Sequence, residues 1–321
     1  MNNINNNFFY KLKPEKILGK GSHGTVILTN NNNYTVKIYT KRTKNLIMLV
    51  SILNFFINYK NIPNSIYKSY YLTEKKNSLN RYIVNNNLPE QFSFNNKEHN
   101  IKPLLFELMK TYEITLKDFI NKLSKNNSIN NDNKINILIS LFYQGLYTLL
   151  WLYIKKGIVH LDINSDNFFV EKTTEENFII NINDIEFKIP TIGYHLIISD
   201  FGFARSIELV DYDEYKYNIR INLESFDIHP YNDVINFIKI FKKYFKIYFK
   251  IYNIQLSNLD INIDNINMRL INRTQQDYRD MIRSYYKKKD DLKLNIKKFK
   301  NNYFNHFRKY ILNDDSVDTF L

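Results

Sequence analysis

A run of eighteen residues without a charged side chain constrains the fold of this chain more than any other feature. Residues 137–154 read ILISLFYQGLYTLLWLYI. A segment of this length is close to the lower limit for crossing a membrane. It also contains Gln144, Thr148 and three tyrosines, and it leads directly into a polar, loop-like segment. We therefore expect a helix buried at the centre of a large core, and no transmembrane segment.

The composition supports a core of that size. Hydrophobic residues make up 44% of the 321 positions, which suits one large domain or two small lobes. The absence of cysteine excludes disulfides and cysteine-based zinc sites, and is compatible with a reducing compartment. The net charge of +13 accompanies a marked excess of Asn, Ile and Lys, residues with AT-rich codons. We read much of this charge as solvated surface lysine and predict no stable nucleic-acid binding, since charge alone speaks to association and not to fold.

Glycine is scarce, with seven residues in the chain, yet three glycines fall within six positions. Gly19, Gly21 and Gly24 form a G-x-G-x-x-G-x-V string with a β-branched run on each side. A dinucleotide-binding turn needs a helix at the third glycine, whereas here a strand-like TVILT follows. A glycine turn between two strands lets backbone N–H groups lie over nucleotide phosphates. The next predicted strand carries Lys37, whose ammonium can reach the α- and β-phosphates.

Two downstream segments carry the remaining polar chemistry. Residues 160–167, HLDINSDN, match the pattern H-x-D-x-x-x-x-N. In this pattern Asp162 accepts the proton of a substrate hydroxyl, and Asn167 holds a metal ion through its amide oxygen. After the strand-like HLII comes a D-F-G sequence, in which Asp200 is placed to chelate Mg²⁺ beside nucleotide phosphates.

The rest of the chain alternates strand-like and helix-like segments. The expected strands form hairpins around the polar stretch after Thr29 and around Asn183-Asp184, because short polar turns separate β-branched runs there. The other expected elements are a buried helix at 43–58, strands at 65–72 and 102–109, and helices from 115, at 234–252 and in the remainder to about 312.

The glycine string, the strand with Lys37, the 160–167 segment and the D-F-G sequence follow one another in the order found in the eukaryotic-type protein kinase family. The chain resembles that family over about residues 15–250. The resemblance implies an α+β, bilobal protein-kinase fold with ATP between a small β-rich N-lobe and a larger, mainly helical C-lobe. The stretch 189–205, IPTIGYHLIISDFGFAR, is similar to the corresponding region of haspin-like kinases and of serine/threonine kinases of large DNA viruses such as poxviruses. A cytoplasmic location follows, in the host cytoplasm or the virion if the source is viral. The expected divisions are a polar tail at 1–14, an N-lobe at 15–109 with an insertion at about 73–100, a C-lobe at 110–312 and an acidic tail at 313–321.

The resemblance also implies roles for single residues. The cofactors are ATP and Mg²⁺, and the partner is a protein substrate phosphorylated on Ser or Thr. Asp162, Lys37, Asn167 and Asp200 would be catalytic, with Asn167 and Asp200 as metal ligands. Phe106 would be the gatekeeper, and Asp233 would anchor the catalytic loop. The implied nucleotide contacts are Leu18, Gly19, Lys20, Gly21, Ser22, His23, Gly24, Thr25, Val26, Lys37 and the backbone groups of Glu107 and Met109.

The chain departs from the family pattern at the partner of Lys37. No acidic residue occurs between Glu15 and Glu74, although the family places a helix acid near the position of Val50. Either Glu74 reaches in from a displaced helix, or Lys37 has another partner.

Other departures concern the loop itself and its regulation. Leu161 stands where the family has an arginine that pairs with a phosphorylated segment, so we predict no such switch. Asn164 replaces a lysine that contacts the γ-phosphate, and no A-P-E sequence follows Gly202. An active Ser/Thr protein kinase is the first hypothesis, and the alternative is a pseudokinase that binds nucleotide or a partner without efficient turnover. A small-molecule kinase of related fold is a third possibility, against which the full D-F-G and glycine string argue.

Overall fold

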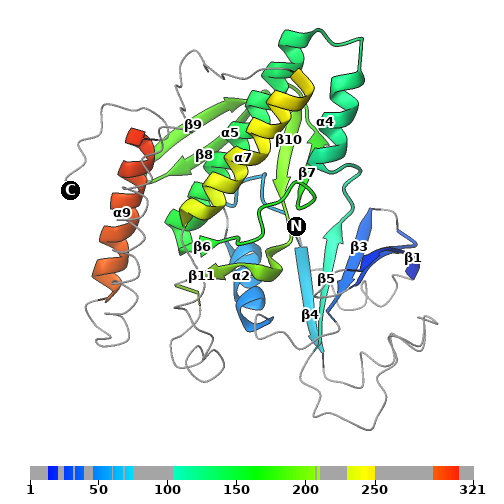
Figure 1. Ribbon diagram of the computed structural model, residues 1–321. Coiled ribbons are helices and arrows are strands. Elements are labelled where there is room, and N and C mark those ends of the chain that lie inside the picture. The colour runs from blue at the N-terminus through cyan, green and yellow to red at the C-terminus, as the bar shows by residue number, and fades with distance from the viewer. Residues whose placement is uncertain are drawn as a thin grey trace. The chain divides into compact units, whose positions relative to one another are not determined.

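The chain forms two compact units in the computed structural model shown in Figure 1. The first unit comprises Met1–Ile62 and Ile66–Glu113, and the second comprises Pro63–Ser65 and Ile114–Leu321. The short segment Pro63–Ser65 thus belongs to the second unit although its neighbours in sequence belong to the first. The structure describes residues 14–20, 25–31, 33–39, 46–59, 61–67, 69–74, 104–206, 208–209, 230–249 and 292–310.

A five-stranded antiparallel sheet is the main element of the first unit. Its strand order is β1-β2-β3-β5-β4, so β5 is an inner strand between β3 and β4. The predicted hairpin from β2 to β3 is confirmed, and β1 also pairs antiparallel with β2. In β2 buried and half-buried residues alternate, as expected for a strand with one face against the core. The strands are Pro14–Lys20 (β1), Thr25–Thr29 (β2), Tyr34–Ile38 (β3), Ser69–Glu74 (β4) and Leu104–Lys110 (β5).

One helix, α2 (Leu46–Asn58), lies in the same unit and contacts β4 of this sheet. It contains no charged residue, and Ile52, Leu53 and Phe56 are among its buried side chains. The first turn has no acidic residue and the last turn has no basic residue, so charged side chains do not stabilise the helix through its dipole. Burial of its apolar surface stabilises it instead. The predicted buried helix is therefore confirmed.

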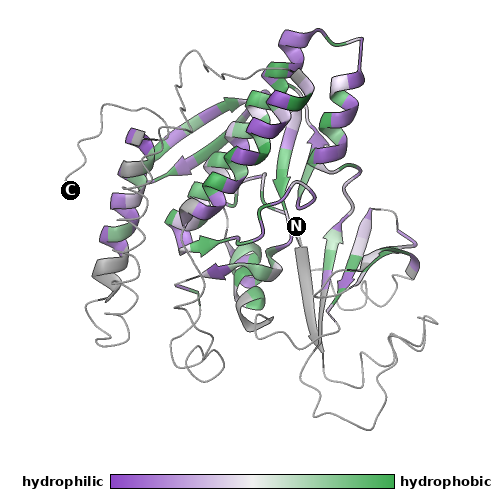
Figure 2. Ribbon diagram, viewed as in Figure 1, coloured by the Kyte–Doolittle hydropathy of each residue, from purple (hydrophilic) through white to green (hydrophobic). Residues whose placement is uncertain are grey.

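The second unit is mainly helical and is built around α5 (Asn131–Lys156). Asn130 caps the start of α5 by accepting a hydrogen bond from the backbone N–H of Asn133 at 2.8 Å, and Gly157 ends it in the left-handed conformation. The helix is hydrophobic over most of its length and hydrophilic at both ends (Figure 2). The other helices of this unit are α4 (Leu116–Lys125), α7 (Pro230–Phe249) and α9 (Leu292–Tyr310).

Aromatic packing joins α5 to α7 and α9. Phe142 of α5 stacks on Phe237 of α7 with ring centroids 5.9 Å apart, and α7 lies alongside α5 in Figure 1. Near the other end of α5, Tyr153 meets Tyr303 of α9 edge-on at 4.7 Å. Within the described residues α5 alone is long and apolar enough to cross a membrane, but 89% of its apolar window is buried. The prediction of a core helix is confirmed.

The second unit also contains three two-stranded sheets. The β8–β9 hairpin turns at Asn183 and Asp184, both of which have positive φ angles of 47° and 65°. Two consecutive left-handed residues are the signature of the type I′ turn, which Asn and Asp tolerate, so the predicted hairpin is confirmed. The pairs are β6 (Ile158–Val159) with β11 (Arg205–Ser206), β7 (Phe168–Lys172) with β10 (Tyr194–Ile198), and β8 (Asn177–Ile182) with β9 (Ile185–Pro190).

Some expected boundaries differ from the structure. The strand expected at 65–72 begins only at Ser69 and extends to Glu74, because Ser65 bonds to the second unit instead. Residues 1–13, 75–103 and 311–321 lie outside the described residues, and with them most of the expected tails and insertion. The chain is a mixed α/β protein with a β-sheet in its N-terminal region and helices later.

Candidate functional site

A polar loop, His160–Asn167, joins two of the strand pairs in the second unit. It follows β6 and leads into β7, so its two ends are fixed by the pairing of β6 with β11 and of β7 with β10. In this loop Leu161 has a φ of 63°, in the left-handed region that residues other than glycine rarely adopt. Such strained positions persist only where surrounding contacts hold them, and they are frequent at functional sites.

The Asp162 carboxylate is held by two side-chain amides. Asn164 donates its Nδ2 to Asp162 Oδ1 at 3.1 Å, and Asn167 donates its Nδ2 to Oδ2 at 2.8 Å. Each carboxylate oxygen has a second lone pair beyond the one engaged by the amide. The two amides therefore fix the direction of the carboxylate without removing its capacity to accept a proton.

Asn167 presents its two polar ends in different directions. Its Nδ2 donates to the backbone oxygen of Asp162 at 2.8 Å as well as to the carboxylate. Because the amide nitrogen is bound to Asp162, the amide oxygen is turned away from that residue. An amide oxygen is a ligand that Mg²⁺ accepts.

Asp200 lies at the same sheet edge as Asn167. Asn167 immediately precedes β7, Asp200 follows shortly after β10, and these strands pair with Ile198 opposite Phe168. Ser199 closes the edge by donating its backbone N–H and its hydroxyl to the backbone oxygen of Asn167, at 2.9 and 2.8 Å. The Asp200 backbone is left-handed, with φ 59°, and its carboxylate accepts the Gly202 N–H at 3.3 Å.

This donor set fits one Mg²⁺ ion held jointly with phosphate oxygens. Mg²⁺ in phosphoryl-transfer sites takes one or two carboxylate or amide oxygens from the protein and completes its shell with phosphates and waters. Asn167 and Asp200 supply one amide and one carboxylate. Among the described residues no group of three or more His, Asp or Glu side chains could hold a metal by itself.

His160 connects the loop to the segment that contains Asp200. It is fully buried, and its Nε2 lies 2.8 Å from the backbone oxygen of Ser199. A carbonyl can only accept, so Nε2 carries the proton, and Nδ1 accepts the backbone N–H of Asp162 at 3.3 Å. The imidazole ring also meets the ring of Phe201 with centroids 5.0 Å apart. One buried histidine thus connects the two halves of the site.

Asp233 of α7 anchors the loop from the other side. Its carboxylate accepts the backbone N–H of His160 at 2.5 Å and that of Leu161 at 2.9 Å. The contact that the kinase resemblance implied for Asp233 is therefore present. Burial raises the pKa of this carboxyl, and the hydrogen bonds from the two backbone N–H groups act in the opposite direction.

Asn164 organises the loop in a way that the sequence pattern did not reveal. Its Oδ1 accepts the backbone N–H groups of Asp166 and Asn167 at 3.0 and 3.2 Å, while its Nδ2 donates to Asp162. Asn side chains often bond to the backbone two residues on, which is the only local signal that could have indicated this role. The sequence also gave no indication of the Ser199 contact.

The other candidate residues belong to the first unit. Lys37 is in β3 and is buried. Glu107 and Met109 lie inside β5, paired with β3 on one side and β4 on the other. Their expected backbone contact with adenine stays a prediction, and these backbones belong to a strand paired on both edges. Leu18, Gly19 and Lys20 are in β1, Thr25 and Val26 begin β2, Phe106 is in β5, and Gly21, Ser22, His23 and Gly24 lie outside the described residues.

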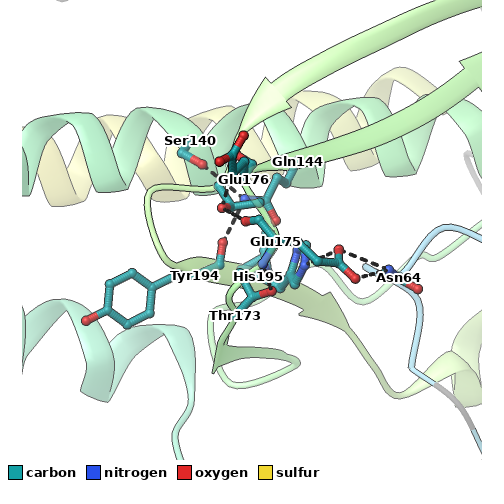
Figure 3. Close-up of polar contacts among 10 residues, drawn as sticks. Asn64, Ser140, Gln144, Thr173, Glu175, Glu176, Tyr194 and His195 are labelled. Carbon is teal, nitrogen blue, oxygen red and sulfur yellow. Dashed lines mark hydrogen bonds and ion pairs between the residues drawn. The ribbon is translucent and has the colours of Figure 1, made fainter.

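A second polar network lies in the second unit (Figure 3). The buried Gln144 of α5 donates to Ser140 and to the backbone oxygen of Tyr194, both at 3.0 Å, and accepts the Leu196 N–H at 3.0 Å. The partners of this side-chain amide thus lie in β10 and in α5 itself. We read Gln144 as a structural residue that fixes the position of β10 and hence of Asp200 beyond it.

The same network extends to the segment Pro63–Ser65. His195 Nε2 lies 2.9 Å from Glu175 Oε2, and Glu175 accepts the Asn64 amide at 3.4 and 3.5 Å (Figure 3). These contacts tie β10 to a residue that is distant in sequence. None of these three hydrogen bonds involves Asp162, Asn167 or Asp200.

Comparisons with known proteins do not assign this chain to a family. A scan against protein-family models returned no match, and neither did a search of the curated proteins.

Proposed function

We propose that this chain is an ATP-dependent protein kinase that transfers the γ-phosphoryl group to Ser or Thr hydroxyls of a protein substrate. The observation that carries the proposal is the arrangement of Asp162, Asn167 and Asp200 in the second unit. Asn167 holds the Asp162 carboxylate with its amide nitrogen, and its backbone oxygen accepts a hydrogen bond from Ser199, the residue before Asp200. A base beside a pair of magnesium ligands is the arrangement that phosphoryl transfer to a hydroxyl requires.

In the proposed reaction the substrate oxygen forms a bond to the γ-phosphorus, and the bond from that phosphorus to the oxygen of ADP breaks. Asp162 orients the attacking hydroxyl and accepts its proton, and ADP leaves. Bound Mg²⁺ supplies charge neutralisation at the phosphates, and Asn167 and Asp200 are the residues that would hold it. The assignment of Lys37 and of the glycine string to the phosphates depends on the sequence motifs.

The first test is transfer of labelled γ-phosphate to generic acidic and basic proteins with Mg²⁺. We expect Asp162→Ala to lower the rate by about 10²–10⁴-fold, the usual contribution of a positioned general base. The matched control is Asp166→Ala, because Asp166 lies in the same loop with an exposed side chain. If Asp162→Ala transfers phosphate as fast as the wild type, the assignment of the base is wrong.

A pseudokinase is the second candidate, and two observations favour it. Helix α2 carries no acidic residue that could hold Lys37, and Asn164 stands where the kinase family has a phosphate-binding lysine. This candidate predicts that Mg²⁺ and ATP raise the unfolding temperature while no substrate is phosphorylated. Measuring thermal shift and turnover on one preparation separates the two candidates.

A further inference from the structure

Asn164 uses both ends of its side chain inside the His160–Asn167 loop. Its Nδ2 lies 3.3 Å from the backbone oxygen of Asp162 and 3.1 Å from the carboxylate oxygen Oδ1 of the same residue. Its Oδ1 accepts the backbone N–H groups of Asp166 at 3.0 Å and of Asn167 at 3.2 Å. A side-chain amide has two N–H donors and two acceptor lone pairs. The loop therefore engages the full hydrogen-bonding capacity of this side chain.

This use of the amide restricts what Asn164 can do in the site. A side chain that contacts the γ-phosphate must direct a donor at the phosphate oxygens, whereas both donors of Asn164 meet acceptors of Asp162. A contact with phosphate would break one of these hydrogen bonds. Asn164 therefore differs in chemistry from the lysine that the kinase family has at this position, whose ammonium binds the phosphate.

The two ends of the amide serve two different functional residues. The nitrogen of Asn164 bonds to the carboxylate oxygen Oδ1 of Asp162, while Asn167 donates to the other oxygen, Oδ2, at 2.8 Å. The side-chain oxygen of Asn164 accepts the backbone N–H of Asn167, which also meets the backbone oxygen of Asn164 at 3.2 Å. One side chain is thus bonded both to the proposed base and to a proposed metal ligand.

The bond from the Asp166 N–H to Asn164 gives the loop a defined turn. An Asn side chain that accepts the N–H two residues on forms an Asx-turn, which takes the place of a backbone hydrogen bond. This turn lies in a loop whose ends are fixed by β6 and β7 through their pairing with β11 and β10. Asn164 therefore holds the backbone between Asp162 and Asn167 as well as the direction of the Asp162 carboxylate.

We propose that Asn164 is a positioning residue that holds the base Asp162 and the metal ligand Asn167 in one fixed arrangement and does not bind the transferred phosphoryl group. It acts on the reaction through these two residues. The proposal rests on the function proposed above and adds a residue that the reaction needs. It also removes Asn164 from the observations that favour a pseudokinase.

Three substitutions at Asn164 separate the roles of its two ends. Asn164→Asp keeps the oxygen that accepts the two N–H groups and puts an oxygen in place of the donor that faces Asp162. Asn164→Ala removes both ends, and Asn164→Lys supplies the family's cation but removes the amide. The matched controls are the Asp and Ala variants of Asn126, which lies between α4 and α5. Its Oδ1 accepts the backbone N–H of Ser128 at 2.9 Å in the same kind of turn.

Steady-state transfer of phosphate from Mg²⁺-ATP is the first measurement. We expect Asn164→Asp to lower kcat by roughly 10–100-fold and to change KM for ATP by less than about twofold, because a misdirected base slows the chemical step without removing a nucleotide contact. Asn164→Lys should lower kcat by a similar factor, and both Asn126 variants should match the wild type. A kcat of Asn164→Lys at or above the wild-type value would overturn the proposal, as would a wild-type kcat in Asn164→Asp.

Amide hydrogen exchange at Asp166, measured by NMR on the full-length chain, does not depend on turnover. The Asp166 N–H is a better reporter than that of Asn167, which keeps the backbone oxygen of Asn164 as an acceptor. We expect exchange at Asp166 to rise about 2–10-fold in Asn164→Ala, as for one lost hydrogen bond, and to stay at the wild-type rate in Asn164→Asp. Wild-type exchange in Asn164→Ala would show that this side chain does not hold the loop.

The two measurements distinguish failure of this proposal from failure of the proposed function. A wild type that phosphorylates no substrate refutes the kinase and with it the positioning role, while exchange at Asp166 still decides whether Asn164 holds the loop. An active wild type with undiminished kcat in Asn164→Asp refutes the positioning role alone. If Asn164→Ala does not fold, the kcat of Asn164→Asp decides, because that variant keeps the acceptor of the turn.

Discussion

Asp233 holds the His160–Asn167 loop through a contact that depends on both of its carboxylate oxygens. Each oxygen accepts one backbone N–H, from His160 and from Leu161. A loop that carries a residue with a positive φ, as Leu161 does, needs such external support. The geometry of Asp162 therefore depends on a residue some seventy positions later in the chain.

Asp233→Asn tests this dependence at the scale of one residue. The amide keeps the shape of the side chain but turns one acceptor into a donor, which then faces a backbone N–H. We expect the free energy of unfolding to fall by about 1–3 kcal/mol, the penalty for a buried polar group left unsatisfied. Phosphoryl transfer should fall as well, because the loop loses its anchor.

The control for this change is Asp166→Asn, the same substitution at an exposed residue of the loop. Asp166 pairs with Lys117 at 3.9 Å, and surface pairs of this kind contribute about 0–1 kcal/mol. Urea unfolding of both variants measures the difference. Equal stability of the two variants would show that the Asp233 contact does not hold the loop.

The candidate site could be predicted only in part from residue types. The sequence identified Asp162, Asn167, Asp200 and Asp233, because each occurs at a fixed spacing within a short motif. It could not place Lys37 opposite Glu107, since the two residues are seventy positions apart and are neighbours only through the register of two strands. No local pattern carries that register.

At the scale of elements, α5 and α7 pack closely at Gly145. An added Cβ at this position would overlap the ring of Phe237 and lie 2.7 Å from Leu196 Cδ2. Phe237 and Leu196 are both fully buried, so neither can move into solvent. Glycine is present in the middle of this helix because no larger side chain fits.

We therefore expect Gly145→Ala to destabilise the protein. Alanine favours a helix by about 1 kcal/mol over glycine, but overpacking a closed core costs about 1–3 kcal/mol, and the predicted overlap is severe. The midpoint of urea unfolding should fall. Gly19→Ala is the comparison, because a Cβ at Gly19 meets no atom within 4 Å. If Gly145→Ala is as stable as Gly19→Ala, the close approach of the two helices is wrong.

The elements themselves were largely predictable, since most follow local hydrophobic patterns. The hairpin at Asn183-Asp184 and the core helix α5 are examples in which turn chemistry and apolar length decide the outcome. The expected strand at 65–72 was wrong in its first residues. Ser65 accepts the Ile198 N–H at 2.7 Å, a contact with a residue more than a hundred positions away that a local pattern cannot show.

At the scale of the whole molecule, the two units do not divide the sequence cleanly. Pro63–Ser65 packs with the second unit, where Ser65 bonds to the hydroxyl of Thr148 and to the backbone of Ile198. A fragment that starts at Ile114 lacks these partners. The Ile198 N–H, on a fully buried residue, would then lose its acceptor.

We predict that residues 114–321 alone unfold at a lower temperature than the same unit in the full chain. One unsatisfied buried group costs about 1–3 kcal/mol, which corresponds to roughly 2–12 °C for a unit of this size. Circular dichroism of both proteins measures the shift. A peptide of residues 61–67 added in excess should restore part of it, by binding the folded state. Coincident transitions without peptide would contradict the role of this segment.

The position of α5 in the chain has a consequence for synthesis. The elements that cover it (β6, β8, β10, α7 and α9) all follow it in sequence, and α9 ends at Tyr310, 154 positions after Lys156. At about 5–20 residues per second, roughly 8–30 s of translation separate the two. During that interval the nascent chain displays a hydrophobic segment as long as a membrane span. We therefore expect α5 to be accessible to ribosome-associated chaperones and targeting factors before these elements can cover it.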